Sequence, residues 1–261
     1  MSRSSGSRRV LAPAAVLVAA LGAWQLAASW GVLADALSIE PFLIPSPSEI
    51  AEALWADREL LAEDAWVTLR EVVLGFGLAL VAGLGFATLL HLSDTLRRAL
   101  YPLLVASQTV PIIVIAPILV VWFGFGIGPK LAIVALICFF PITVNTLDGL
   151  RSVDPDLVKL MRTLDATRWR TFTRAEAPSA LPYAFSGAKI AIAVAVIGAV
   201  FGEWSGSDAG LGHLMLQASA QLETPLLFAA VVVLSAGAVA LFGALSLLER
   251  RVAWWGIGND G

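Results

Sequence analysis

Long hydrophobic runs without charged residues divide the chain. They cover residues 10–34, 72–93, 99–129, 131–147 and 224–248, and a sixth run from about 183 to 200 is interrupted only by Lys189. A helix needs roughly 20 mostly apolar residues to cross about 30 Å of hydrocarbon, so the short run 131–147 must borrow from Pro129 and Lys130. The runs are continuously apolar and do not alternate, which favours helices over barrel strands. The pattern predicts an all-α integral membrane protein with six transmembrane helices.

The positions of the basic residues predict the orientation of these helices. With the N-terminus in the cytoplasm, thirteen of the 17 Lys and Arg residues fall on the inner side. Arg58, Arg70 and Lys130 fall on the outer side, and Lys189 lies within the fifth span. Because cytoplasmic loops carry an excess of Lys and Arg, both termini are expected in the cytoplasm.

This topology predicts a division of the chain. The expected parts are a cytoplasmic N-terminus (1–9), a first transmembrane helix (10–34), an acidic outer loop (35–65), a membrane domain (66–249) that contains an inside loop (148–182), and a cytoplasmic tail (250–261). The apolar run after Arg8 and Arg9 is longer than the core of a signal peptide, so we expect a retained helix. In the outer loop, Ser46 and Glu49 have the spacing of a capped helix start.

Composition supports the membrane assignment and restricts the chemistry. Hydrophobic residues make up 58% of the 261 residues, charged residues 14%, and the mean hydropathy is +0.83. These values differ from those of soluble domains. Cys138 is the single cysteine, which excludes an intrachain disulfide. The sequence contains no phosphate-binding loop and no nucleophile-base pattern, so it predicts no catalytic residue, no metal site and no cofactor of its own. The glycines of GFGIGPK at 124–130 are expected to make a tight outer turn between the third and fourth spans.

The inside loop 148–182 has the pattern of two short helices. Asp154, Pro155 and Asp156 form a helix start, and Thr167 is placed to cap a second helix that Pro178 should end. The apolar residues Leu160, Met161, Trp169 and Phe172 are expected on one side and Arg162, Arg168 and Arg170 on the other. Such a surface suits a groove of another protein. The alternative is a basic loop that lies on anionic lipid.

Polar residues within the spans are candidates for a substrate pathway. Pro102, Pro111 and Pro117 are each expected to break the third span, and irregular backbone at membrane depth occurs along cavities or within protein. Ser107, Gln108 and Thr109 lie beside this break, and Asn145 and Thr143 lie near Pro141 in the fourth span. All of them have the alternative of hydrogen bonding between helices.

Two charged residues of the fifth span, Glu203 and Lys189, each have two possible roles. Glu203 is a further candidate for the substrate pathway, at an outer gate or a binding-protein interface, and its alternative is a charge at the outer membrane surface in contact with water. Lys189 is expected to extend to the cytoplasmic face, with a substrate contact as the alternative.

The inside loop resembles the cytoplasmic loop of ABC importer permeases. That family pattern has Glu-Ala-Ala, then a Gly, then a distal hydrophobic-Pro pair. Here Lys159, Leu160 and Met161 occupy the first positions, Asp165 the Gly position, and Ala177 and Pro178 the last. The surrounding residues match the family or are close equivalents: Leu164, Ala166, Arg168, Trp169, Phe172, Pro178, Ala180, Leu181 and Pro182. Asp tolerates left-handed backbone better than most residues, so Asp165 is compatible with this turn.

The resemblance extends from about residue 45 to residue 251. SQTVPIIVIAPILVVWFGFGIGPK at 107–130 is similar to the sulfonate, taurine and nitrate branch of these permeases. LYPLLVASQTVPII, CFFPITVNTLDGLRSVDPDL and IGAVFGEW look most like permeases for thiamine-pyrimidine precursors, and near relatives are assigned to riboflavin.

This resemblance implies a fold and a set of partners. It implies the type I importer permease fold and a permease homodimer in the bacterial inner membrane. A pair of ATPase subunits would bind ATP-Mg inside, and a periplasmic or lipid-anchored substrate-binding protein would dock outside. The resemblance also implies a set of ATPase-coupling residues: Asp156, Lys159, Leu160, Met161, Leu164, Asp165, Ala166, Arg168, Trp169, Phe172 and Pro178. The rival class is an ion-coupled secondary transporter, which usually needs buried ionisable residues; the sequence offers only Lys189 clearly inside a span.

Overall fold

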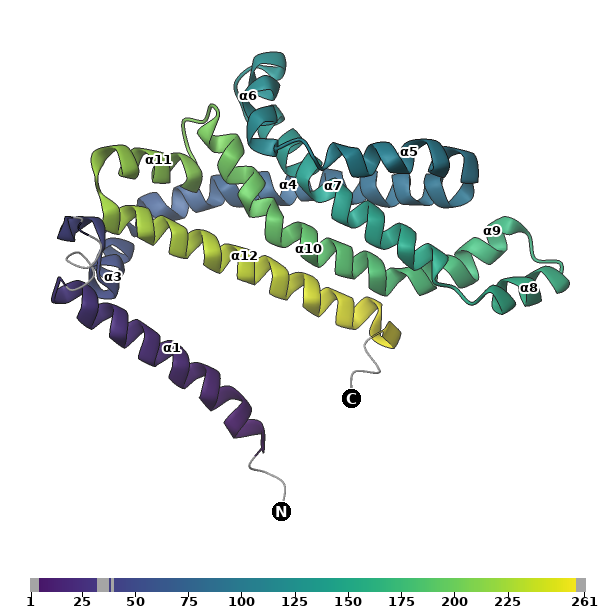
Figure 1. Cartoon of the computed structure of the whole chain (residues 1–261), viewed down its shortest axis with the longest axis horizontal. Helices are drawn as coiled ribbons and strands as arrows, with labels where there is room; N and C mark the ends of the chain where they lie inside the picture. Colours follow the sequence, from purple (N-terminus) through teal and green to yellow (C-terminus); the bar gives the residue numbers. More distant parts are fainter. Residues whose placement is uncertain (1–4, 32–37, 39, 257–261) are drawn as a thin grey trace. The chain divides into compact units, whose positions relative to one another are not determined.

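The computed structural model describes residues 5–31, 38 and 40–256, and every regular element within these ranges is helical (Figure 1). Four described helices are long and apolar enough to cross a membrane: α4 (Arg58–Leu92), α7 (Ile127–Arg151), the continuous helix Arg168–Trp204, and α12 (Thr224–Val252). The bent pair α5 (Asp94–Ser107) and α6 (Ile112–Phe123) makes a fifth if it counts as one span. The all-helical prediction is therefore confirmed.

The count of six spans and the cytoplasmic position of both termini remain predictions. Helix α1 (Ser5–Ser29) occupies most of the predicted first span, and its described apolar part is Ala15–Ser29. Residues 32–34 of that span, 35–37 and 39 of the outer loop, 1–4 of the N-terminus and 257–261 of the tail lie outside the described residues.

The chain divides into two compact units. The first comprises Met1–Asp64 and Leu214–Val233, and the second comprises Ala65–His213 and Leu234–Gly261. The first contains α1, the short helix η1 (Pro41–Leu43), α3 (Pro47–Ala56) and most of α11 (Leu211–Gln221). The second contains α5, α6 and α7, the helices α8 (Pro155–Thr163), α9 (Arg168–Thr171) and α10 (Ala177–Trp204), the π-turn η2 (Phe172–Glu176) and η3 (Trp254–Gly256).

Polar contacts organise the first unit. The Ser46 side chain accepts from the Glu49 N–H, and the Glu49 carboxylate accepts from the Ser46 N–H at 2.6 Å, which confirms the predicted helix start at α3. Gln25 of α1 donates from Nε2 to Ser48 Oγ and accepts from the Ser48 N–H, both at 3.0 Å. This paired contact fixes α1 to the start of α3.

Small residues allow α7 and α10 to pack closely in the second unit. The two helices run side by side in Figure 1, and α10 turns a buried face of alanine and glycine toward α7. A Cβ added at Gly198 would lie 3.0 Å from Ile137 Cδ1, and one added at Gly187 would lie 2.6 Å from the Pro141 carbonyl oxygen. Small residues at such contacts let membrane helices approach each other. The buried core beside this contact includes Val134, Cys138 and Ile142.

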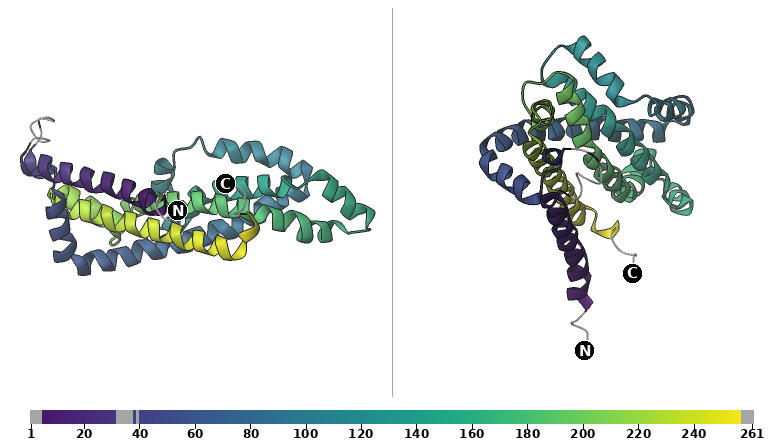
Figure 2. Two further views of the ribbon diagram at one scale, coloured as in Figure 1. Left: turned by 90° about the horizontal axis from the view of Figure 1, so that it is seen from below. Right: turned by 60° about the vertical axis from the view of Figure 1, so that its left-hand side comes forward.

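Proline and glycine set the geometry between α5 and α7, which can be followed in Figure 2. The chain bends by 99° between α5 and α6, with Pro111 at the N-cap of α6. Pro102 and Pro117 lie inside α5 and α6 without ending them, so the expectation of three breaks was wrong. Gly124 (φ 75°) and Gly126 (φ 128°) form the predicted turn before α7. Since α7 begins at Ile127, it includes Pro129 and Lys130 as expected.

Candidate functional site: a buried polar cluster and a coupling segment

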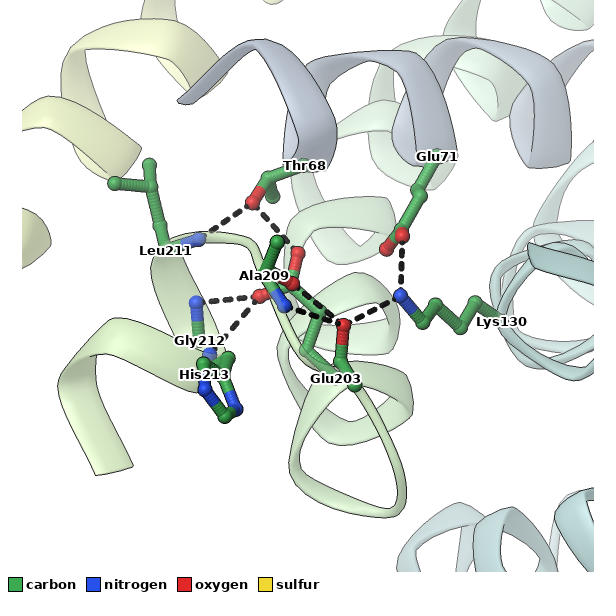
Figure 3. Close-up of polar contacts among 9 residues, drawn as sticks. Thr68, Glu71, Lys130, Glu203, Ala209, Leu211, Gly212 and His213 are labelled. Carbon is green, nitrogen blue, oxygen red and sulfur yellow. Dashed lines mark hydrogen bonds and ion pairs between the residues drawn. The ribbon is translucent and has the colours of Figure 1, made fainter. Parts of the chain in front are cut away.

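A buried polar cluster joins α4, α7, α10 and the loop before α11 (Figure 3). The Lys130 ammonium donates to Glu71 Oε1 at 2.7 Å and to Ser207 Oγ at 2.6 Å. The side chains of Lys130 and Glu71 are only 8% and 3% exposed. A charge this deeply buried requires a partner, because removal from water costs several kcal/mol per ion. Lys130 therefore ties α7 to α4 and to the 205–210 loop.

Glu203 at the end of α10 holds the first turn of α11. Its carboxylate accepts from Thr68 Oγ1 at 2.6 Å and from the backbone N–H groups of Gly212 and His213. Thr68 Oγ1 in turn accepts from the Leu211 N–H at 2.8 Å. The free N–H groups at a helix start carry partial positive charge and stabilise a carboxylate. Glu203 and Thr68 together cap α11.

The cluster contains more carboxylates than cations. The Lys130 ammonium contacts Glu71 and Ser207, whereas the Glu203 carboxylate contacts Thr68 and the first amide groups of α11 (Figure 3). The second oxygen of Glu71, Oε2, is buried and has no hydrogen-bond partner among the described residues. Lys130 and the α11 amide groups therefore supply the compensation that these two carboxylates need.

Glycine is required where the 205–210 loop passes Glu203. Gly210 has φ +113°, and a Cβ added there would overlap the Glu203 carboxylate. L-residues rarely adopt this backbone conformation, and the carboxylate fills the space that a side chain needs.

Gly210→Ala is expected to destabilise the second unit by about 1–3 kcal/mol through backbone strain, with additional loss if Glu203 is displaced. The measurement is the midpoint of thermal unfolding in detergent. Gly237→Ala is the matched control, because no heavy atom lies within 4 Å of a Cβ added at Gly237. Equal midpoints for the two variants would show that the loop accepts a side chain.

Sequence reasoning did not find most of this cluster. Glu203 was considered as an outer charge in contact with water, but it is only 1% exposed, so that alternative is wrong. Lys189 was considered the only charge clearly inside a span, yet Glu71, Lys130 and Glu203 are all buried within helices. The partners lie 59 and 135 residues apart in the sequence, so no local pattern indicated the pairing.

Lys189 also has a partner that its sequence context did not predict. Its ammonium donates to Glu249 Oε2 of α12 at 2.8 Å, and the Lys189 side chain is 25% exposed. The pair joins α10 to α12 within the second unit.

The coupling segment, defined as residues 154–178, begins with two capped helices. Asp154 Oδ1 accepts from the Asp156 N–H at 2.8 Å, and Thr167 Oγ1 accepts from the Arg170 N–H at 3.3 Å. Both predicted helix starts are thus confirmed. Between the helices Asp165 has φ 54°, the left-handed conformation. The turn closes with the Ala166 N–H donating to the Met161 carbonyl at 3.0 Å.

The apolar side of the coupling segment is exposed. Leu160 is 54% exposed, Leu164 69% and Trp169 67%. The Trp169 ring stacks on Phe172 with 5.5 Å between centroids. Figure 1 shows α8 and α9 projecting beyond the adjacent ends of α7 and α10. Lys159 pairs with Asp156 at 2.8 Å on the exposed surface. This is an apolar surface with charged residues around it, as protein-protein contacts require.

The second helix of the coupling segment does not end at Pro178, contrary to the sequence prediction. It continues through the π-turn η2 into α10, so Arg168–Trp204 is one helix of 37 residues. In the π-turn the Ala177 N–H bonds to the Phe172 carbonyl, one residue further back than in an α-helix. This changed register precedes Pro178, which occupies the first turn of α10, where a missing N–H is tolerated.

The base of the coupling segment is held to the ends of two other elements. His91 at the end of α4 lies 2.8 Å from Glu176 Oε2 in the π-turn, and Arg168 donates to the Leu92 carbonyl at 3.3 Å. His91 and Glu176 have side chains 11% and 16% exposed. The segment is thus fixed at its base and exposed at its apolar side.

The comparison with protein families assigns the chain. Residues 75–254 match the family described as binding-protein-dependent transport system inner membrane component. The chain belongs to this family of ABC transporter permeases. The prediction from the loop and its surrounding residues is confirmed, and the chain is a membrane transport subunit.

Relatives support the assignment over most of the permease. A probable ABC transporter permease protein of Haemophilus influenzae is 38% identical, covering 94% of this chain and 98% of the relative. The formylaminopyrimidine transport permease protein ThiX of Halalkalibacterium halodurans is 40% identical, covering 83% and 87%. The riboflavin transport system permease protein RibX of Chloroflexus aurantiacus is 38% identical, covering 82% and 81%. The permease is therefore a subunit of an ABC importer.

A solved structure shares the fold. A chain of the MetNI methionine ABC transporter aligns with a TM-score of 0.64 and 20% identity, covering 76% of the permease and 96% of that chain. At this identity the match shows the fold alone. It confirms the importer permease architecture that the loop resemblance implied.

Of the residues predicted to line the pathway of the permease, Glu203 lies in the polar cluster described above, and the others fall into two places. Ser107, Gln108 and Thr109 lie together at the bend between α5 and α6, where Ser107 Oγ donates to the Leu104 carbonyl at 2.7 Å and Thr109 Oγ1 to the Ala106 carbonyl at 2.8 Å. Asn145 lies instead at the α7–α10 contact, and its Nδ2 donates to the Pro141 carbonyl at 2.8 Å. The structure does not bring these two groups together, and their contact with substrate remains a prediction.

Asp165 offers a local test of the coupling segment. We expect Asp165→Gly to keep the turn and full transport, because glycine adopts the left-handed conformation without strain. Asp165→Val should destabilise this turn by about 1–3 kcal/mol and lower the transport rate. Transport by both variants in proteoliposomes is the measurement. Full transport by the valine variant would contradict a need for this backbone geometry.

Proposed function

We propose that the permease moves a thiamine-pyrimidine precursor inward across the bacterial inner membrane, driven by ATP-Mg hydrolysis on a separate pair of ATPase subunits. The observation that carries the ATPase contact is the exposed apolar surface of Leu160, Leu164 and Trp169 on a segment whose base is fixed. The substrate class rests on the 40% identity to the formylaminopyrimidine permease. Riboflavin transport is the alternative that the 38% identity to the riboflavin permease favours.

The mechanism in this proposal is alternating access. The ATPase subunits would close on ATP binding and move the coupling segment, and this motion would reorient the spans around a central pathway. Ser107, Gln108 and Thr109 support a pathway at the α5–α6 bend, because their polar groups lie where the backbone leaves the helix. Glu203, which holds the start of α11, would be a further pathway residue.

Two further subunits belong to the proposed assembly. A second copy of the permease would cover the apolar side chains of α6 and the following turn, where Val121 is 81% exposed, Trp122 73% and Phe125 83%. A periplasmic or lipid-anchored binding protein would deliver the substrate to the outer face, which agrees with the binding-protein-dependent family assignment.

The test is uptake by the reconstituted importer. The permease is purified with the ATPase and binding protein encoded beside it, and the binding protein is first screened with formylaminopyrimidine, riboflavin and taurine. ATP-dependent uptake of the labelled pyrimidine into proteoliposomes is the expected result. Uptake of riboflavin or taurine alone would overturn the substrate and leave the importer class intact. Uptake driven by a proton gradient without ATP would overturn the class.

A further inference from the structure

A basic cavity lies where the start of α5 meets the end of α7. Its volume is about 320 Å³, and Arg97, Arg98 and Arg151 supply its cationic groups. One acidic residue, Asp148, lines it. The apolar part of its wall comes from Tyr101, Pro102 and Leu147. All of these residues belong to the second unit.

The arginines of this cavity are not all engaged by carboxylates. Arg97 pairs with Asp94 at 2.8 Å. Arg98 and Arg151 make no ion pair with any residue in the described part of the chain. The cavity therefore has two guanidinium groups available against the single carboxylate of Asp148, which leaves a positive charge for an external anion.

Arg98 and Arg151 also line two neighbouring hollows, each of which includes one acidic residue, Asp94 in the first and Glu176 in the second. Arg98 also lines a neighbouring hollow of about 560 Å³ at the start of α5. Arg151 also lines a hollow of about 350 Å³ with Lys159 and Arg162 of α8. Three adjoining hollows thus share the two available arginines, so an anion held by Arg98 and Arg151 would lie beside the base of the coupling segment.

The chemistry of this cavity fits a phosphodiester with an apolar body. Guanidinium groups bind phosphate oxygens in pairs of parallel hydrogen bonds. Val105 lies four residues after Tyr101, on the same face of α5, and is 45% exposed, so it offers an apolar surface to an acyl chain. The distribution of Lys and Arg predicts that these helix ends lie at the inner leaflet, whose surface carries anionic lipids. A free phosphate ion would make no use of the apolar wall.

We propose that this cavity binds the headgroup of an anionic phospholipid from the inner leaflet, with Arg98 and Arg151 as its phosphate ligands. The lipid would fill the space between α5 and α7 and lie next to α8. This site is independent of the transported substrate.

The experiment measures which lipid the intact importer retains. The complex is equilibrated in vesicles of phosphatidylethanolamine and phosphatidylglycerol in equal parts, extracted in mild detergent, and examined by native mass spectrometry. We expect phosphatidylglycerol to be enriched on the parent protein. Arg98→Gln with Arg151→Gln should reduce that preference roughly tenfold or more, since each basic residue contributes to attraction at an anionic surface.

Matched variants distinguish specific binding at Arg98 and Arg151 from non-specific attraction of anionic lipid to positive charge. Arg250→Gln with Arg251→Gln removes two exposed arginines near the end of α12, away from the cavity, and should leave the preference unchanged. Arg98→Lys with Arg151→Lys keeps the charge and loses the paired geometry, so it should give an intermediate preference. An equal loss in the Arg250 and Arg251 variant, or no loss in the Arg98 and Arg151 variant, would overturn the proposal.

Inorganic phosphate distinguishes the two sources of the anion. Added to the extracted complex, it should leave the bound phosphatidylglycerol in place, because the apolar wall contributes only to lipid binding. Displacement of the lipid by phosphate at concentrations near those of the cell would assign the site to free phosphate instead and overturn the lipid proposal.

Discussion

Removal of the exposed Leu160 and Trp169 side chains should separate the permease from its ATPase without unfolding it. Both side chains are more than half exposed, and neither belongs to the buried core. An aromatic residue at the centre of a protein contact often carries 2 kcal/mol or more of binding free energy, so Leu160→Ala with Trp169→Ala should weaken ATPase binding by roughly thirtyfold or more. ATP-driven uptake should fall accordingly.

The measurement is binding of the purified ATPase to the permease in detergent, together with uptake in proteoliposomes. The matched control is Leu60→Ala with Trp55→Ala, which removes the same two side-chain types at positions 41% and 74% exposed in the first unit. The control should bind the ATPase normally. If the Leu160 and Trp169 variant also binds normally, the coupling segment is not the ATPase contact.

Lys130→Met should destabilise the permease more than any other single change considered above. It leaves Glu71 buried without its cation, and such a broken pair typically costs about 3–5 kcal/mol. Methionine has a similar length, so packing changes little. Lys130→Met with Glu71→Met should recover much of the loss, because two apolar residues can replace a buried ion pair.

The free energy of unfolding is measured by detergent denaturation in mixed micelles. Lys159→Met is the matched control, since Lys159 pairs with Asp156 where both side chains are more than 70% exposed, and its loss should cost about 0–1 kcal/mol. If Lys130→Met costs no more than Lys159→Met, the cluster does not depend on its cation. If the double variant is no more stable than Lys130→Met, the uncompensated Glu71 charge is not the cause.

Local signals in the sequence predicted the parts of the fold that local chemistry determines. Apolar runs located the spans because each helix satisfies its own backbone groups in lipid. Asp154, Thr167 and Ser46 identified helix starts through short-range hydrogen bonds. Gly124 and Gly126 identified a turn that needs positive φ. Each of these features depends on residues only a few positions apart.

The parts that depend on distant residues were not predictable in the same way. The outer loop was expected to continue to residue 65, although α4 begins at Arg58 and buries the Glu71 side chain against Lys130. Pro178 was read as a helix end because the preceding π-turn leaves no clear mark in the sequence. Burial and pairing in these cases depend on how the helices pack, and a single amino-acid sequence does not reveal that packing.

The continuity of Arg168–Trp204 gives the permease a mechanical connection between its two ends. Thirty-seven residues at about 1.5 Å each form a rod roughly 55 Å long. One end carries Trp169, and the other ends beside Glu203, which holds the first amide groups of α11. Under the proposed function, a displacement applied by an ATPase at Trp169 would need no relay of separate contacts to reach Glu203 at the other end of this helix. The backbone of one helix can transmit it.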